Sequence, residues 1–196
     1  MIIGLTGGIA SGKSTAARYL MKNGALVMDG DVLGHRAYEP ATAAFAMIAE
    51  TFGSDVIGAD GQIDRKVLGS KVFGNPDALK QLTDILYPEI RRMFSVWIET
   101  THADNPEALL VMDAAVLLEA GWEDLADEIW VVIVDPDTAV TRAVARDNLD
   151  EAAVRKRIAS QLSNDERTTR ADVVIDNSGN EAALVVRLDA EMKRIR

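Results

Sequence analysis

The segment Gly7-Gly8-Ile9-Ala10-Ser11-Gly12-Lys13-Ser14 has residue types and a spacing, G-x-x-x-x-G-K-[ST], that could hold a phosphate chain. Glycines let the backbone curl so that successive N–H groups form an anion nest, and a helix beginning near Ser14 would direct its positive dipole end at the same anion. Lys13 would add a charge for the β- and γ-phosphates, and the Ser14 hydroxyl would be a ligand for Mg²⁺. The pattern predicts binding of a nucleoside triphosphate, with a chance Gly-rich turn as the alternative. The expected contacts are Gly8, Ala10, Ser11, Gly12, Lys13, Ser14 and Thr15.

Acidic residues at the ends of two apolar runs could serve the same phosphate. Asp113 closes Leu109–Asp113, the pattern of a carboxylate that holds Mg²⁺ or its water shell; alternatively, it caps the next helix. Asp29 and Asp31 end the run that starts at Leu26. Because ligands of open α/β sheets bind beyond the carboxyl ends of strands, these acids are expected at the correct edge. One of them could accept the proton of a substrate hydroxyl that attacks the γ-phosphate, with a surface turn as the alternative.

The basic residues are pooled in one later segment. Residues 93–135 contain ten acidic residues and no Lys or Arg, whereas 136–170 contain seven basic and six acidic residues. Arg142 and Arg146 are four positions apart, on one helical face. Arginines of a mobile segment could stabilise the charge of a transferring phosphoryl group, together with Arg155, Arg157, Arg167 and Arg170. Solvated helical faces are the alternative.

Short apolar runs alternate with helical patterns along the chain. The expected strands are Ile2–Thr6, Leu26–Asp29, Leu109–Asp113, Ile129–Val134 and Val173–Ile175. The expected helices are Ser14–Asn23, Pro76–Thr100, Pro136–Arg146, Glu151–Leu162 and Glu181–Ile195. Asn75 and Asp135 each precede a proline and mark two helix starts. The alternation predicts an α/β fold with five strands in one parallel sheet, and the stretch 53–101 predicts a helical insert over it.

The composition excludes several classes of protein. With 196 residues, 48% hydrophobic and 27% charged, the chain can bury one core, and a single domain is expected. It has no Cys and only 2 His, which excludes disulfide scaffolds, thiol catalysis and His-rich metal clusters. The net charge of −10 argues against nucleic-acid or membrane-surface partners. Without a basic leader or an apolar run near ~20 residues, we expect a soluble, cytoplasmic protein.

The chain resembles the dephospho-coenzyme A kinase family over nearly its whole length. Leu5–Thr15 is similar to that family's LTGGIGSGKST, with Ala10 in place of the usual glycine, and Asp29-Gly30-Asp31 resembles its D-A-D motif. Further matches, in the family's order, are Phe52-Gly53, Gly61–Arg65, Val72-Phe73, Asp113–Glu119, Gly121, Gln161, Arg167, Ala171–Asn177 and Gly179.

The resemblance implies a P-loop NTPase fold of three layers, with the strand order 2-3-1-4-5 of nucleotide-monophosphate kinases. It implies one domain over residues 1–196, with a core at about 1–52 and 102–196, a helical insert that binds coenzyme A at about 53–101, and a lid at about 136–170. The implied reaction moves the γ-phosphate of ATP, with Mg²⁺, to the ribose 3′-hydroxyl of 3′-dephospho-coenzyme A, the last step of coenzyme A synthesis.

The resemblance also assigns roles to residues of this chain. The implied catalytic residues are Asp31 as the general base, Lys13 at the γ-phosphate and Arg142 as the lid arginine. The implied metal site contains Ser14 and Asp113, and Asn177 lies on the loop expected near adenine.

Some residues depart from the family's pattern, and other functions remain open. Tyr87-Pro88 stands where the family usually has His-Pro, so a positive charge is not available there. Asp113-Ala114-Ala115-Val116 lacks the usual proline. The alternatives are another small-molecule P-loop kinase and a nucleotide-gated switch, but no guanine-reading N-K-x-D motif occurs. A monomer is the favoured oligomeric state.

Overall fold

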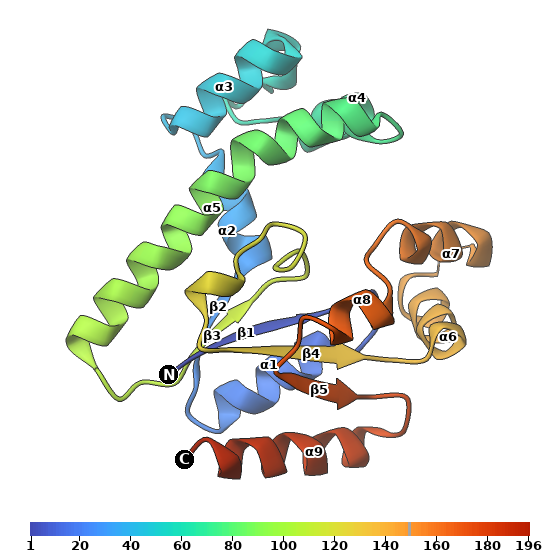
Figure 1. The fold of residues 1–196 in the computed structure, drawn as a ribbon. Coiled ribbons are helices and arrows are strands. Elements are labelled where there is room, and N and C mark those ends of the chain that lie inside the picture. Colours follow the sequence, from blue (N-terminus) through green and yellow to red (C-terminus); the bar gives the residue numbers. More distant parts are fainter. Residues whose placement is uncertain (149) are drawn as a thin grey trace. The chain divides into compact units, whose positions relative to one another are not determined.

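The computed structural model describes residues 1–148 and 150–196, which form two compact units. The first unit consists of Met1–Met28 and Thr101–Arg196, and the second of Asp29–Thr100. The first unit contains the phosphate loop and nearly all of a β-sheet, whereas the second is built mainly from helices (Figure 1). The stretch expected as a helical insert, 53–101, falls almost wholly in the second unit.

Five strands form one sheet in the order β2-β3-β1-β4-β5, which confirms the predicted α/β fold and strand order. The strands are β1 (Ile2–Gly7), β2 (Leu26–Asp29), β3 (Leu110–Asp113), β4 (Glu128–Ile133) and β5 (Val173–Asp176). The bounds of each strand lie within one residue of the predicted run. In the central strand, Leu5 pairs in parallel with Asp113 of β3 and Trp130 of β4. The carboxyl ends of these strands therefore share the edge at which the phosphate loop begins.

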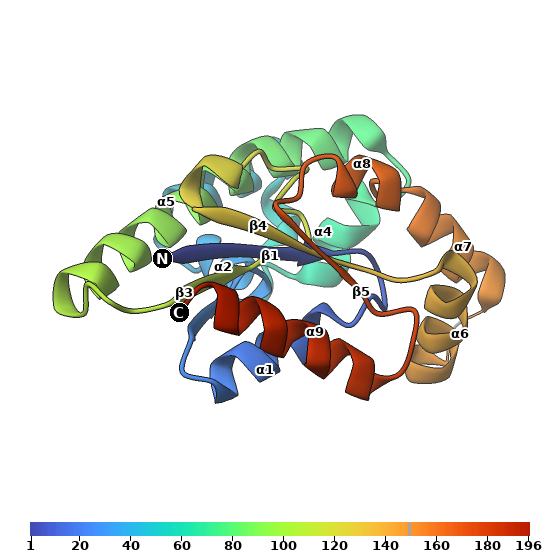
Figure 2. The same ribbon diagram turned by 60° about the horizontal axis from the view of Figure 1, so that its bottom comes forward.

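The helices of the first unit are α1 (Lys13–Lys22), α6 (Pro136–Asp147), α7 (Glu151–Ala159), α8 (Asn164–Thr168) and α9 (Glu181–Arg194), with a 3₁₀ turn at Glu123–Leu125. Helices α1 and α9 lie side by side on one face of the sheet, and α8 lies on the opposite face (Figure 1, Figure 2). Helices α6 and α7 contact each other beyond the end of β4. The carboxylate of Asp135 accepts hydrogen bonds from the N–H groups of Asp137 and Thr138, both at 3.0 Å, which confirms this predicted helix start.

The core of the first unit lies between the sheet and the pair α1 and α9. Ile3 and Leu5 of β1, Trp130 of β4, Leu20 of α1 and Leu188 of α9 are completely buried there. Burial of one such aliphatic side chain stabilises a fold by roughly 1.5–3 kcal/mol. This packing fixes α1, and with it the end of the phosphate loop, to the sheet.

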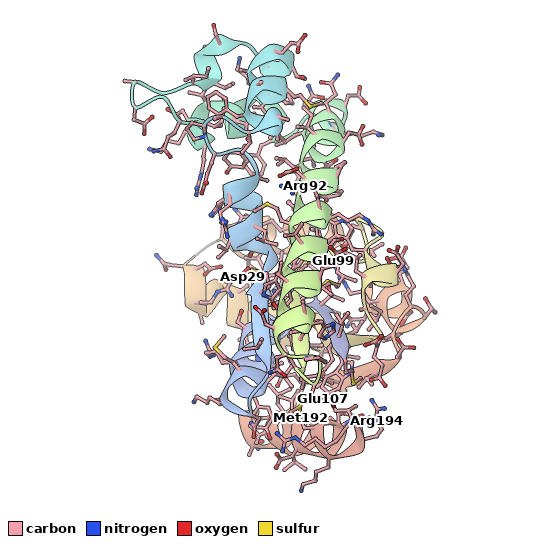
Figure 3. All side chains as sticks on the ribbon, turned by 90° about the vertical axis from the view of Figure 1, so that its left-hand side faces the viewer. Asp29, Arg92, Glu99, Glu107, Met192 and Arg194 are labelled. Carbon is pink, nitrogen blue, oxygen red and sulfur yellow. The ribbon has the colours of Figure 1, made fainter. Side chains whose placement is uncertain are left out.

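A polar contact also joins the end of α9 to the sheet. Arg194, in the last turn of α9 (Figure 3), donates two hydrogen bonds to the carboxylate of Glu128, at 2.6 and 2.9 Å. Glu128 is the first residue of β4. The guanidinium of Arg194 holds the pKa of Glu128 below its ordinary value, so the contact belongs to the ionised carboxylate.

The second unit has a core of its own. Its helices are α2 (Gly30–Ala37), α3 (Ala43–Phe52), α4 (Arg65–Val72) and α5 (Pro76–Asp104), of which α5 belongs to this unit up to Thr100, with a 3₁₀ turn at Ser54–Val56. Ile48 of α3, Val56 and Leu68 of α4 are buried together. The Asn75 side-chain oxygen accepts from the Ala78 N–H at 3.2 Å, which confirms the second predicted helix start. A single antiparallel bridge, Ile57 to Ile63, occurs where no strand was predicted.

Four helices are absent from those whose bounds were predicted from the sequence: α2, α3, α8 and, within the expected helical insert, α4. Helix α2 has glycines at Gly30 and Gly34, which lower its intrinsic propensity, and it follows β2 directly. Asp29 is both the last residue of β2 and the N-cap of α2, since its side chain accepts from the Asp31 N–H at 2.8 Å. The surface turn considered for Asp29 and Asp31 is therefore wrong. Helix α3 does carry a sequence signal, because its N-cap Thr42 precedes an alanine-rich run.

The part of the chain that the structure describes contains no helix that combines the length and apolar character needed to span a bilayer.

Candidate phosphate-binding and catalytic site

The phosphate loop connects β1 to α1 and leaves the start of that helix open to a ligand. Gly12 is the N-cap of α1, and no side-chain hydrogen bond caps the helix there. Ser14, in the first turn, is exposed. Uncapped N–H groups and the helix dipole together favour an anion at this position. The strand, loop and helix thus have the arrangement that the motif predicts.

Neighbouring atoms lie so close to two positions of the loop that only glycine fits there. A Cβ on Gly7 would lie 2.5 Å from the Val132 carbonyl oxygen and 2.6 Å from Ser11 Oγ. Gly12 has a φ of 98°, and a Cβ there would overlap the side-chain amide of Asn177. Both positions therefore require glycine for space, and Gly12 also requires it for its backbone conformation.

Ala10 occupies a left-handed backbone conformation. Its φ is 55°, in the region where a Cβ costs roughly 1–2 kcal/mol. The family's usual glycine would adopt this conformation without that cost. The loop conformation at Ala10 must therefore be maintained by contacts with the rest of the protein.

Asn177 follows β5 and contacts the phosphate loop directly. Its side chain is 6% exposed, and its Nδ2 donates a 2.7 Å hydrogen bond to the Ser11 carbonyl. Its own N–H donates to the Ile133 carbonyl at 2.9 Å, next to the end of β4. The predicted nucleotide residue is thus brought to the loop, where its amide binds the backbone.

Lys13 and Asp113 form an ion pair at the carboxyl ends of β1 and β3. The two side chains are 14% and 9% exposed, and Lys13 Nζ donates to Asp113 Oδ1. A turn follows β3, so the alternative in which Asp113 caps the next helix is wrong. The structure brings together the lysine of the loop and the carboxylate expected at the metal.

A cavity of about 600 Å³ adjoins the phosphate loop within the first unit. This volume falls in the range of about 300–1,000 Å³ found for small-molecule sites. Gly8, Ile9 and Ser11 of the loop line one side. The other lining residues are Val134, Pro136, Ala139, Ile158, Ala159 and Gln161–Glu166. The end of β4, helices α6 and α7, and the start of α8 therefore surround this space.

The arginines of the basic segment mostly contact acidic side chains of the protein. Arg142 donates to the Gly179 carbonyl at 3.0 Å, on the loop that carries Asn177. Arg155 binds Glu151 and Asp137, and Arg146 binds Asp147. Arg170 binds Glu123 and the Leu118 carbonyl. Among these residues, the structure brings Arg142 alone to the site loops, so a general role in phosphoryl binding for the segment does not follow.

Arg167 is a buried cation that sequence reasoning placed among the candidate phosphate contacts. Its side chain is 0% exposed. Its guanidinium donates to Glu119 at 2.9 Å and to the Leu162 carbonyl at 3.2 Å. It therefore connects the segment after β3 with the residues at the cavity. An arginine in a charged sequence gives no local signal of such burial.

Asp31 and Tyr87 belong to the second unit. The Asp31 side chain is exposed in the first turn of α2. Four residues later, His35 Nε2 lies 3.2 Å from Arg65 Nη1 of α4. Tyr87 precedes Pro88 inside the continuous helix α5.

Comparison with known proteins identifies the family. A family model described as dephospho-CoA kinase matches residues 1–183. The chain belongs to the dephospho-CoA kinase family. A dephospho-CoA kinase of Geobacter sulfurreducens is 43% identical over 188 residues, covering 96% of this chain and 95% of that protein. The family to which the motifs pointed is thereby confirmed.

Solved structures show the same fold. The crystal structure of TT1252 from Thermus thermophilus has a TM-score of 0.83 at 30% identity and covers 100% of this chain and 98% of its own. A dephospho-CoA kinase from Campylobacter jejuni has a TM-score of 0.65 at 24% identity, covering 99% and 96%.

Proposed function

We propose that this chain transfers the γ-phosphate of ATP to the ribose 3′-hydroxyl of 3′-dephospho-coenzyme A, which gives coenzyme A and ADP. The observation that carries the proposal is a phosphate loop with Lys13 and Asp113, beside a cavity of about 600 Å³, in a member of the dephospho-CoA kinase family. The family match runs through both units, which disfavours a different small-molecule kinase and a nucleotide-gated switch.

The phosphate loop binds the triphosphate and supplies most of the charge stabilisation. The contacts are made by Gly8, Ala10, Ser11, Gly12, Lys13, Ser14 and Thr15. N–H groups at the start of α1 face the phosphate chain, and Lys13 leaves Asp113 to neutralise charge at the β- and γ-phosphates. Asn177 maintains this loop near the adenine, and Arg142, on the neighbouring helix, supplies a guanidinium for the transferring group.

Asp31 acts as the general base. The 3′-oxygen of the acceptor forms a bond to the γ-phosphorus while the bond from that phosphorus to the β,γ-bridging oxygen breaks, and ADP leaves. The hydroxyl proton passes to the Asp31 carboxylate, which is exposed and therefore accessible to a substrate. Support for this role comes from the match of Asp29-Gly30-Asp31 to the family's acidic motif.

Magnesium fits the oxygen donors beside the loop. The Ser14 hydroxyl is exposed at the start of α1, and the Asp113 carboxylate contacts the loop lysine. Mg²⁺ is usually held by one or two protein oxygens together with water and substrate phosphates. Ser14 and Asp113 would hold it, and it would neutralise charge on the β- and γ-phosphates.

The single chain is the working unit in this proposal. Residues of about 53–101 bind the coenzyme A moiety, and residues of about 136–170 form the lid over a core of about 1–52 and 102–196. The net charge of −10 supports a small-molecule partner rather than nucleic acid or a membrane surface. The proposed location is the cytoplasm.

ADP release from Mg·ATP tests the substrate. Dephospho-coenzyme A should support turnover, whereas pantetheine, pantothenate, AMP, gluconate and shikimate should not. Asp31→Asn should lower kcat about 10²–10⁴-fold, because it removes the base with little change of shape. Turnover with a different acceptor only would overturn the substrate assignment while leaving a kinase.

Asp29→Asn is the matched control for Asp31. Asparagine caps a helix as well as aspartate does, so α2 should keep its start and the activity should stay near that of wild type. If Asp29→Asn abolished turnover and Asp31→Asn did not, the base would be Asp29.

A further inference from the structure

A glutamine that follows helix α7 forms a hydrogen bond to the backbone of the phosphate loop. Gln161 lies between α7 and α8 and lines the cavity. Its Oε1 accepts a 3.0 Å hydrogen bond from the Ile9 N–H, across 152 positions of sequence. A Cβ placed on Gly8 would lie 3.6 Å from the same oxygen, so the amide lies against the first half of the loop.

The Ile9 side chain contacts the same helical segment. It packs, with Ala10, against Val140 and Ala143 of α6 and Val154 of α7, all of which are buried. Both the backbone and the side chain of Ile9 are therefore bound by residues of α6, α7 and the chain that follows them.

The two halves of the loop have different supports. Asn177 binds the second half through the Ser11 carbonyl. The first half contains Ala10, whose positive φ requires an external constraint. Gln161 and the apolar contacts of Ile9 are the contacts that the structure provides immediately next to it.

We infer that Gln161 is a positioning residue for nucleotide binding: its hydrogen bond to Ile9 keeps the first half of the phosphate loop in the conformation that accepts phosphate. The inference rests on the proposed nucleotide site but not on the identity of the acceptor. It also connects the loop to α6 and α7, so a displacement of these helices would change the loop.

Gln161→Met tests this role, because methionine has a similar length and lacks the amide oxygen. Hydrogen exchange of the Ile9 amide in the ligand-free protein should become at least about tenfold faster. The Kd for ADP and the KM for ATP should each rise about five- to tenfold, with kcat and the KM for the acceptor changing less than about twofold. Gln161→Glu retains the acceptor oxygen, so it should retain the slow exchange of Ile9 even though its charge opposes the nucleotide.

Lys193→Met, at an exposed position of α9, is the control and should leave exchange and affinity unchanged. Unchanged Ile9 exchange or unchanged ADP affinity in Gln161→Met would overturn the inference. If wild type failed to bind ADP, the proposed nucleotide site itself would fall. If Gln161→Met did not fold, Gln161→Glu would be compared with wild type instead. Fast exchange of the Ile9 amide in Gln161→Glu would then overturn the positioning role of Gln161.

Discussion

At the scale of single residues, Asn177 joins two segments that lie 166 positions apart in the sequence. Its buried amide donates to the Ser11 carbonyl, and it fills the space that a Cβ on Gly12 would need. The side chain thus restrains the second half of the loop, whereas Gln161 binds the first half. An effect of Asn177 on nucleotide binding would therefore come through the backbone of the loop.

Asn177→Asp should destabilise the protein by about 1–3 kcal/mol, because a carboxylate oxygen would replace the donor that faces the Ser11 carbonyl. Urea unfolding measures this change, and ADP affinity should fall in parallel. Asn180→Asp is the control: Asn180 caps α9, and aspartate caps equally well. A loss below about 0.5 kcal/mol, the usual scatter of surface substitutions, would contradict the argument.

The sequence predicts the phosphate loop well because its requirements are local. Glycine positions, the lysine and the following helix lie within a few residues of one another. The supports of that loop are not local: Gln161 and Asn177 reach it across the fold. Arg167 shows the same limit, since nothing in its charged segment predicted that this residue is completely buried against Glu119.

At the scale of elements, helix starts marked by a cap and a proline were predicted correctly, at Asn75 and Asp135. Such starts depend on one side chain and the fixed φ of proline, both visible in the sequence. Helix α2 was missed because it follows β2 directly and contains two glycines. Tertiary contacts, rather than propensity, must stabilise such a helix.

Asp135→Ala should destabilise the start of α6, which borders the cavity. The substitution removes the acceptor of two N–H groups, a change that typically costs about 0.5–2 kcal/mol. Urea unfolding and hydrogen exchange of Asp137 and Thr138 measure the effect. Asp135→Asn keeps the acceptor oxygen and should remain close to wild type. Equal losses in both variants would show that the charge of Asp135, and not its capping bonds, is what matters.

At the scale of the whole molecule, residues of the acidic segment 93–135 bind residues of the adjoining basic segment 136–170 within the first unit. Arg167 binds Glu119, and Arg170 binds Glu123, so basic residues after α7 contact acidic residues after β3. A chain with a net charge of −10 thereby reduces local repulsion around its sheet. Lowering the pH protonates the carboxylates, so we expect it to weaken such ion pairs.

The pair Glu128–Arg194 shows in which direction the stability of the protein should change with pH. Arg194 lowers the pKa of Glu128 in the folded protein, so the stabilisation is complete above the unfolded-state pKa of about 4.3 and is lost as the pH falls through the lower folded-state pKa. Glu128→Gln should therefore lower the Tm at pH 7, and its difference from wild type should shrink below about pH 4.

Thermal unfolding between pH 3 and pH 8 measures this difference. Glu107→Gln, an exposed carboxyl in a turn and also labelled in Figure 3, is the control and should keep the wild-type midpoint at pH 7. A Glu128→Gln difference that stayed constant down to pH 3 would show that the lost contact is not an ionic one.

The ion pair between Lys13 and Asp113 has a consequence for which anions this site accepts. The loop lysine is not an unbalanced charge, because its carboxylate partner lies against it and both are largely shielded from water. A bare anion that binds Lys13 would compete with the Asp113 carboxylate for the same ammonium group in a poorly solvated place, which is unfavourable. A phosphate chain that arrives with its own cation would give Lys13 a new negative partner and Asp113 a new positive one. We therefore expect free phosphate to bind this site more weakly than a nucleotide that carries its own metal ion, because only the metal–nucleotide complex would replace both charges of the salt bridge.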